Sequence, residues 1–414
     1  MKNHNHLTLF CVILVLLILL PIAGLTRDVH ADPMAGVRNV GFYQQTNWMS
    51  HDGRNATQLL AGMDADFVMR GWFKSVIESP NWFVTLQNSI SELKAARPSI
   101  IYEGGISAAT IISGDTYADG TAISPADFSC MQAKDVNGNP ITHNAGYLSD
   151  LACPAYQTFL TGWCERQIDA GVDALFFDEV YTYAGYKIRQ LGADPASTYN
   201  QYEGYFASLV STLKSYASSK SRSLLVTTNG GYATRLHPTS YDVTYQAQDF
   251  LTFSIGLNDF VPPFNLQENW AQLKQTLGLN LPIMAFIDFS NPGQDTAMTR
   301  FAKLSTQDQI TVLKEIDAAT RAAGVLFAYP IFLAHAYDAT AAGTYDTIVS
   351  LARSSASATS STASVSQATQ TSTVSSQLTT APIPGFPWES IITGLALGLA
   401  ALALARRRGK RQVR

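Results

Sequence analysis

Short apolar runs alternate with longer amphipathic segments through the middle of the chain. The runs are rich in β-branched and aromatic residues, which is typical of buried strands. They predict eight strands, at residues 39–44, 66–72, 99–105, 173–180, 223–231, 243–250, 281–289 and 324–332. Helical periodicity predicts helices at residues 83–96, 155–170, 199–219, 266–277, 305–323 and 345–354. Strands that alternate with helices indicate right-handed βαβ units and a parallel sheet.

Eight strand–helix units in one chain predict an α/β protein with a closed (β/α)8 barrel, the TIM-barrel fold. An open dinucleotide-binding sheet would carry a GxGxxG turn after its first strand, and the sequence after residues 39–44 lacks one. Residues 36–353 have the length of one such barrel with insertions. We therefore expect a single (β/α)8 barrel domain over this range.

The amino-terminal segment falls outside this rhythm. Residues 7–20 are almost wholly apolar, follow Lys2, and precede the small residues Val29 and Ala31. This is the layout of a secretory signal peptide. We expect residues 1–31 to be removed on export, and a retained membrane anchor is the alternative.

The carboxyl-terminal segment predicts a tether. Residues 354–382 are almost entirely Ser, Thr, Ala, Gln and Val, a composition that cannot bury enough apolar surface to fold, so we predict a disordered stalk. An apolar run at 391–405 and six Arg or Lys residues follow, which is a stop-transfer pattern. A helix of that length reaches only about 22 Å, short of a hydrocarbon core of about 30 Å.

The motif Pro384-Gly385-Phe386, followed by this apolar and basic tail, resembles the carboxyl-terminal sorting signals of archaeal surface proteins. The resemblance implies that a sortase-type enzyme removes residues 383–414 and transfers the protein to a lipid. Permanent anchoring by a transmembrane helix is the alternative interpretation. In both cases we expect an extracellular domain attached to the membrane at the cell surface.

Charge and cysteine content narrow the function further. The whole chain carries −4, and removing the six tail cations and the net +1 of residues 1–31 leaves −11. Such an acidic domain is a poor nucleic-acid binder, because phosphates require basic patches. Cys130 and Cys153 flank one long segment and are the favoured disulfide in an exported protein, which leaves Cys164 free.

Acidic residues gather at the predicted carboxyl ends of the strands, where (β/α)8 barrels place their active sites. The catalytic candidates are Asp178, Glu103, Asp249, Glu179 and Asp288.

Strand alternation orients three of these carboxylates. It places Asp178 in phase with Ala174 and facing the barrel mouth, and Glu179 outward or in the following loop. It also places Asp288 in phase with Phe286. Arg70, at the end of the second strand, is a candidate ion-pair partner for Glu103 or Asp178.

Two carboxylates at a barrel mouth are the groups that glycoside hydrolysis requires. One protonates the leaving oxygen, and the other attacks the anomeric carbon or activates a water. Aromatic rings near the strand ends could stack on sugars, and amides could bind hydroxyl groups. The substrate-binding candidates are Trp72, Tyr102, Tyr181, Asn229, Gln246 and Gln248. Each carboxylate could instead form a structural ion pair or cap a helix, and each ring could belong to the core.

The segment Gly171-Val172-Asp173-Ala174-Leu175-Phe176-Phe177-Asp178-Glu179 resembles the fourth strand of glycoside-hydrolase barrels, both α-galactosidase-like and endo-polygalactosaminidase-like. In the α-galactosidase-like group, the Asp that ends strand four is the nucleophile and the Asp that ends strand six is the acid/base. The resemblance therefore implies Asp178 and Asp249 in these roles, and Glu103 or Glu179 remain alternative proton donors. Asp288 departs from barrels that use Glu at strands four and seven.

These patterns predict a surface-tethered glycoside hydrolase for an extracellular poly- or oligosaccharide, without a cofactor or a metal. A non-catalytic barrel that binds glycan or builds a surface coat is the alternative, and release of cleaved product would distinguish the two. A metal-dependent deacetylase or phosphodiesterase would need clustered His and Asp ligands. The sequence lacks HExxH, GxSxG and GxxxxGK motifs.

Overall fold

The computed structural model describes residues 34–229 except 76 and 80, residues 247–255, residues 281–288, and residues 295–362 except 335. The chain divides into two compact units, residues 1–364 and 365–414, and the second lies outside the described residues.

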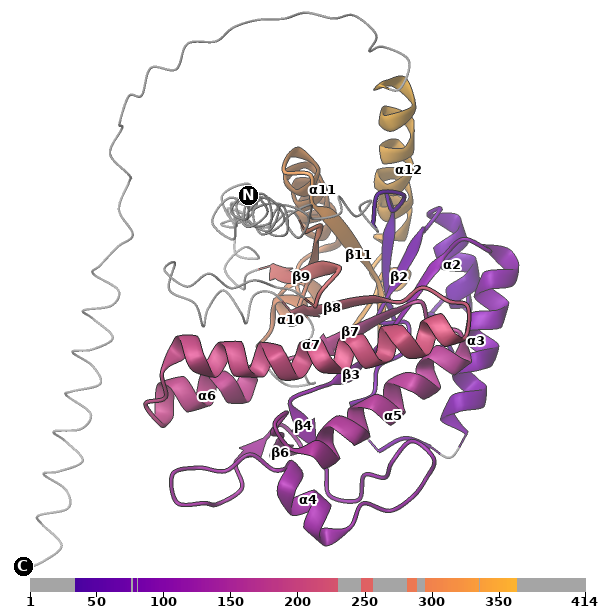
Figure 1. Ribbon diagram of the computed structural model, residues 1–414. Coiled ribbons are helices and arrows are strands. Elements are labelled where there is room, and N and C mark those ends of the chain that lie inside the picture. The colour runs from indigo at the N-terminus through magenta and orange to yellow at the C-terminus, as the bar shows by residue number, and fades with distance from the viewer. Residues whose placement is uncertain are drawn as a thin grey trace, which may run out of the picture. The chain divides into compact units, whose positions relative to one another are not determined.

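The described residues form a closed parallel barrel (Figure 1). Its strands are β1 (Val40–Gln44), β2 (Phe67–Met69), β3 (Ile101–Ser107), β7 (Ala174–Asp178), β8 (Leu225–Asn229), β9 (Phe250–Ile255), β10 (Ile283–Ile287) and β11 (Leu326–Leu333). Each strand pairs in parallel with the next, and β1 pairs with both β2 and β11, which closes the sheet. The predicted (β/α)8 fold is confirmed.

The long helices lie close to their predicted positions. They are α3 (Trp82–Ala96), α5 (Pro154–Ala170), α7 (Pro195–Ser219), α11 (Thr306–Ala322) and α12 (Tyr345–Thr362). Local signals explain their ends: Asp194 caps α7, and Gly171 ends α5 in the left-handed conformation with φ 114°. Figure 1 shows α3, α5 and α7 side by side around β3, β7 and β8.

The structure also differs from the predicted helices. It adds the short helices α2 (Ala56–Gly62), α4 (Pro125–Met131), α6 (Thr182–Gln190) and α10 (Ala297–Ala302), which have too few turns for a periodicity to stand out. The predicted end of the last helix at residue 354 is wrong, since α12 continues to Thr362. The predicted helix at 266–277, the signal peptide and the tail lie outside the described residues. Within those residues, none of the helices has the length and apolar character of a membrane span.

Aromatic side chains fill the barrel interior. The rings of Phe42 and Phe286 meet edge to face with centroids 5.9 Å apart, and those of Phe67 and Phe250 do so at 5.8 Å. Each pair joins non-neighbouring strands, so these rings lie inside the barrel. On each strand that carries one of these rings, the residues two positions before and after the ring therefore also face inward.

The sixth strand is the main error of the sequence prediction. β9 begins at Phe250, so residues 247–249 precede the strand, and residues 243–246 lie outside the described part of the chain. Asp249 accepts the backbone N–H of Val226, near the start of β8, at 2.8 Å and forms an ion pair of 2.8 Å with Lys214. Asp249 therefore lies at the amino end of the barrel, opposite the end where Asp178 terminates β7.

An insertion at residues 108–153 separates β3 from α5. It contains α4 and a three-stranded antiparallel sheet in the order β4 (Thr110–Ile111), β6 (Gly146–Leu148) and β5 (Thr142–His143). The predicted disulfide between Cys130 and Cys153 is confirmed and closes the insertion on the start of α5. Cys164 is free and buried, as expected.

Candidate active site

A buried arginine organises the carboxyl end of the barrel. Arg70 follows β2 directly and is 3% exposed. Its Nη2 donates to Oδ2 of Asp178 at 3.2 Å, and its backbone N–H donates to Oε2 of Glu103 at 2.9 Å. The predicted ion pair of Arg70 therefore forms with Asp178, whereas Glu103 accepts the backbone N–H of Arg70.

Four phenylalanine rings hold the Arg70 guanidinium in place. Its Cζ lies between 4.4 and 5.9 Å from the ring centroids of Phe176, Phe73, Phe286 and Phe42. Cation–π attraction stabilises a guanidinium in such a setting, and the packed rings restrict its rotamers. The fork of Arg70 is therefore aimed at Asp178 before any ligand arrives.

Asp178 lies in the barrel mouth, as strand alternation predicts. It is the last residue of β7, and Phe176, two residues earlier, contributes its ring to the Arg70 cage. The Asp178 side chain is 21% exposed. Burial raises the pKa of Asp178 to about 7 against the opposing effect of Arg70, and the nearby charges of Glu179 and Asp288 raise it further. A carboxyl group with such a pKa exchanges its proton near neutral pH.

Glu103 occupies a deeper position on β3. Its side chain is fully buried, and within the described structure its Oε1 has no hydrogen-bond partner. Burial raises the pKa of Glu103 to about 8, although the backbone N–H and charge of Arg70 oppose this. Because the Glu103 carboxyl is out of contact with solvent, it is positioned to support Arg70 and not to contact a substrate.

Asp288 lies at the carboxyl end of another strand of the barrel. It follows β10 and is in phase with Phe286, whose ring lies inside the barrel. Its charge raises the pKa of Asp178, so the two carboxyl groups act on each other. Asp178 ends the fourth strand of the barrel in sheet order, and Asp288 directly follows the seventh.

Backbone strain gathers at the same end. Gln45, Arg70, Glu179 and Ala334 directly follow β1, β2, β7 and β11 and have φ of 64°, 51°, 57° and 46°. A non-glycine residue in this left-handed region costs on the order of 1 kcal/mol, and such residues concentrate at functional sites. At Glu179 the turn redirects the side chain, so that its Oε2 lies 2.9 Å from Nε2 of His143 in β5.

Two predicted sugar-stacking rings are packed in the protein instead, so that interpretation is wrong. Trp72 is 5% exposed and stacks on Trp82 with centroids 4.9 Å apart. Tyr102 is fully buried, and its hydroxyl lies 2.7 Å from Oγ1 of Thr46. Neither ring offers a face to a ligand.

The other substrate-binding candidates lie in different surroundings: Tyr181 and Gln248 are buried, whereas Asn229 lies near the barrel mouth. Tyr181 is 1% exposed, donates its hydroxyl proton to Glu203, and accepts a hydrogen bond from Nε2 of Gln248 at 2.9 Å. This buried network is structural. Asn229 ends β8 beside the end of β7, because the register pairs Phe177 with Thr228. Asn229 thus keeps a place near Asp178, whereas Gln246 lies outside the described residues.

A second buried ion pair fastens the insertion beside the mouth. Nζ of Lys74 lies 2.8 Å from Oδ1 of Asp115, and the two side chains are 4% and 3% exposed. The other oxygen of Asp115 accepts the backbone N–H of Ile112. The Lys74 backbone continues the edge of β2 along β3 through bonds to Gly105 and Ser107. The pair therefore joins the insertion to the barrel wall.

We expect Asp115→Asn to lower the free energy of unfolding by about 3–5 kcal/mol, because it removes the carboxylate that the buried Lys74 ammonium contacts at 2.8 Å. Urea denaturation measures the change. Asp119→Asn is the matched control in the same insertion, since Asp119 is exposed and should change stability by less than about 0.5 kcal/mol. Equal effects of the two substitutions would show that the buried pair does not hold the insertion.

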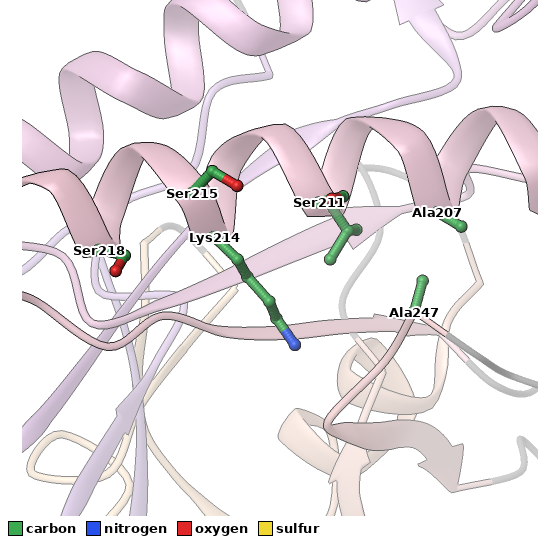
Figure 2. A pocket seen from close by; sticks show the side chains of 7 residues that line it. Ala207, Ser211, Lys214, Ser215, Ser218 and Ala247 are labelled. Atoms are coloured by element: carbon green, nitrogen blue, oxygen red, sulfur yellow. The ribbon is translucent and has the colours of Figure 1, made fainter. Parts of the chain in front are cut away.

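A surface pocket lies away from this site, along α7 (Figure 2). Figure 2 shows Lys214 and small side chains of α7 on one side and Ala247 on the other. The described residues of its lining include no carboxylate, and Lys214 is paired with Asp249. Among the described residues, moreover, no three His, Cys, Asp or Glu side chains are grouped to hold a metal ion.

No protein-family model matches the chain, and no curated protein sequence matches it. Among solved structures, it is similar to the glycoside hydrolase domain of PelA from Pseudomonas aeruginosa, with 15% identity, TM-score 0.40, and coverage of 70% of this chain and 94% of that chain. It is also similar to Aspergillus fumigatus Ega3 in complex with galactosamine, with 12% identity, TM-score 0.35, and coverage of 67% and 90%. The α-amylase of Geobacillus thermoleovorans gives 12% identity, TM-score 0.47, and coverage of 77% and 78%. Similarity at this level concerns the barrel fold, which supports many activities.

Proposed function

We propose that the protein is a glycoside hydrolase that cleaves an extracellular poly- or oligosaccharide, with Asp178 and Asp288 as its catalytic carboxylates. The observation that carries the proposal is Asp178 itself. This partly exposed carboxyl at the barrel mouth is held by a caged arginine, and burial, together with the charges of Glu179 and Asp288, raises its pKa to about 7. Perturbed carboxyl groups at the carboxyl end of a barrel are the expected position and chemistry of an active site.

The roles follow from the environments of the two groups. Glycoside hydrolysis needs one carboxyl that is protonated before the reaction and one that is ionised. Asp178, with its raised pKa, is suited to protonate the leaving oxygen, and Arg70 then stabilises the carboxylate that remains. Asp288 would attack the anomeric carbon or activate water. The resemblance of the fourth strand implies the nucleophile role for Asp178, and a pH profile separates these assignments.

The three other candidate carboxylates fit the acid/base role less well. Asp249 lies at the amino end of the barrel in an ion pair with Lys214, too far along the strands to share a substrate with Asp178. Glu103 is fully buried beneath the site. Glu179 is partly exposed but is engaged by His143.

A glycan screen tests the activity. The purified protein is incubated with a panel of neutral, acidic and amino-sugar polysaccharides, and the products are analysed by mass spectrometry. We expect at least one polymer to be shortened. Tight binding without shortening would instead support a glycan-binding or surface-coat barrel, and acetate release without shortening would indicate a deacetylase.

We also propose that the enzyme is exported and tethered at the cell surface by its carboxyl-terminal tail, after processing by a sortase-type enzyme or as a membrane-anchored chain. The support is the apolar and basic pattern of the two termini together with the disulfide of the insertion, which forms in oxidising compartments. Deleting residues 383–414 should release the protein into the medium, whereas the full chain should stay with the membrane fraction. Retention of both forms inside the cell would contradict export.

A further inference from the structure

The geometry points to His143 as a positioning residue of this active site: the insertion places its imidazole on Glu179 and so fixes the carboxylate that neighbours Asp178. The inference rests on the proposed function. It assigns a task to the insertion, which the barrel fold does not require. It also assigns one to a histidine that is 36 residues from its partner in the sequence.

The insertion is built as a rigid body. Its strands β4 and β5 both pair with β6, the disulfide closes it on α5, and the buried pair of Lys74 and Asp115 ties it to the edge of β2. A group carried by such a body is held in position, because few of its backbone torsions are free to change.

The insertion docks on the residues that follow β7. The backbone N–H of Ala108 donates to the carbonyl oxygen of Asp178 at 2.9 Å. The hydroxyl of Tyr183, in α6, donates to the carbonyl oxygen of Lys134 at 3.0 Å and accepts its N–H at 3.2 Å. The contact between His143 and Glu179 lies in the same interface, so the insertion holds the segment from residue 178 to residue 183 at several points.

Glu179 needs this support. Its backbone is in the left-handed region, where a side chain with a Cβ is strained and persists only if its surroundings hold it. A carboxylate oxygen accepts hydrogen bonds, so in this contact the N–H at Nε2 of His143 donates to Oε2 of Glu179. The side chains of His143 and Glu179 are 21% and 23% exposed, which leaves the pair at the rim of the mouth.

The consequence for catalysis passes through Asp178. The charge of Glu179 acts on Asp178, and its distance from Asp178 depends on the hydrogen bond to His143. Without the imidazole, Glu179 can turn toward Asp178 or away into solvent, and the neighbouring backbone of Asp178 loses its fixed orientation. Misplacement of a catalytic carboxyl by about 1 Å can reduce turnover on the order of 100-fold.

The test compares three variants of the full chain on a polymer that the wild type cleaves. We expect His143→Leu to lower kcat by about 10- to 100-fold with KM within about threefold, because it misaligns the reacting groups rather than removing a contact to substrate. His143→Gln keeps an N–H donor and should recover most of the loss. His51→Leu is the control, since His51 is exposed on a different segment.

A kcat for His143→Leu that matches the His51→Leu value would overturn the inference. A loss of kcat in His143→Leu that His143→Gln does not recover would also overturn it. The same holds for a fall in melting temperature large enough to unfold His143→Leu at the assay temperature. A second arm does not need activity: the melting temperature of the double variant His143→Leu, Glu179→Leu should equal that of either single variant within about 1 °C, because each single substitution already removes the same contact. Full additivity would refute the contact. If the wild type cleaves no glycan but this coupling is present, the proposed function fails while the positioning contact stands.

Discussion

Asp178→Asn is expected to lower kcat for glycoside hydrolysis by about 10³-fold, which is the loss typical of a general acid–base group. Asparagine keeps the shape of the side chain and can still accept the hydrogen bond from Arg70, so the fold should be retained. The loss should therefore appear in kcat at temperatures where the circular dichroism spectrum shows that the variant is folded. Initial rates at saturating polymer measure it.

The matched control for this variant is Asp249→Asn. Asp249 lies at the amino end of the strands, so kcat should remain within about threefold of wild type under conditions where the variant is folded.

The pH dependence of kcat/KM distinguishes the two possible roles of Asp178. With Asp178 as the acid, kcat/KM falls as the pH rises through about 7, whereas with Asp178 as the nucleophile it rises over this range. A large loss of kcat for Asp249→Asn and none for Asp178→Asn would contradict our assignment of the active site to the carboxyl end of the barrel.

Glu103→Gln is expected to stabilise the protein above pH 8. The pKa of Glu103 is raised to about 8 by burial, so between the ordinary pKa of a glutamate, about 4.3, and pH 8 the folded state retains a proton that the unfolded state has released. Stability of the wild type therefore falls as the pH rises through this window. Glutamine does not titrate and keeps an acceptor for the Arg70 backbone N–H, so this part of the fall disappears.

At pH 9 the gain from Glu103→Gln should reach about 2 kcal/mol or more, measured by denaturant unfolding across pH 5 to 9. Glu92→Gln is the control, because Glu92 is exposed on α3 and its substitution should leave the pH dependence unchanged. A Glu103→Gln variant that is less stable than wild type at every pH would show that the site requires the ionised carboxylate.

The sequence predicted the barrel because strand and helix periodicities are local properties of the chain. The run that ends at Asp178 shows this: its apolar residues and the small Ala174 define both the strand and the face on which Asp178 lies. The position of the sixth strand was predicted wrongly because the same signal is only local. A short alternating stretch does not reveal where pairing starts, and an error of a few residues moved Asp249 to the wrong end of the barrel.

The site was predictable only where a strand carries it. Asp178 and Arg70 lie at strand ends, and their opposite charges suggested the ion pair that the structure contains. Trp72 has an equally suggestive position but turns toward α3, because an aromatic ring at a strand end packs equally well against a helix. No sequence pattern predicted a role for His143 at the site, because its contact with Glu179 depends on how a 46-residue insertion folds back over β7.

The most direct test of the central claim is hydrolysis of a susceptible polymer in water enriched in oxygen-18. Our account predicts that each new reducing end is about 2 Da heavier than in ordinary water, because a water oxygen joins the anomeric carbon when the glycosidic bond breaks. Asp178→Asn should form these ends about 10³-fold more slowly. Shortened products without the heavy oxygen, or labelled ends that form at the wild-type rate in Asp178→Asn, would contradict a hydrolase that acts through this carboxyl.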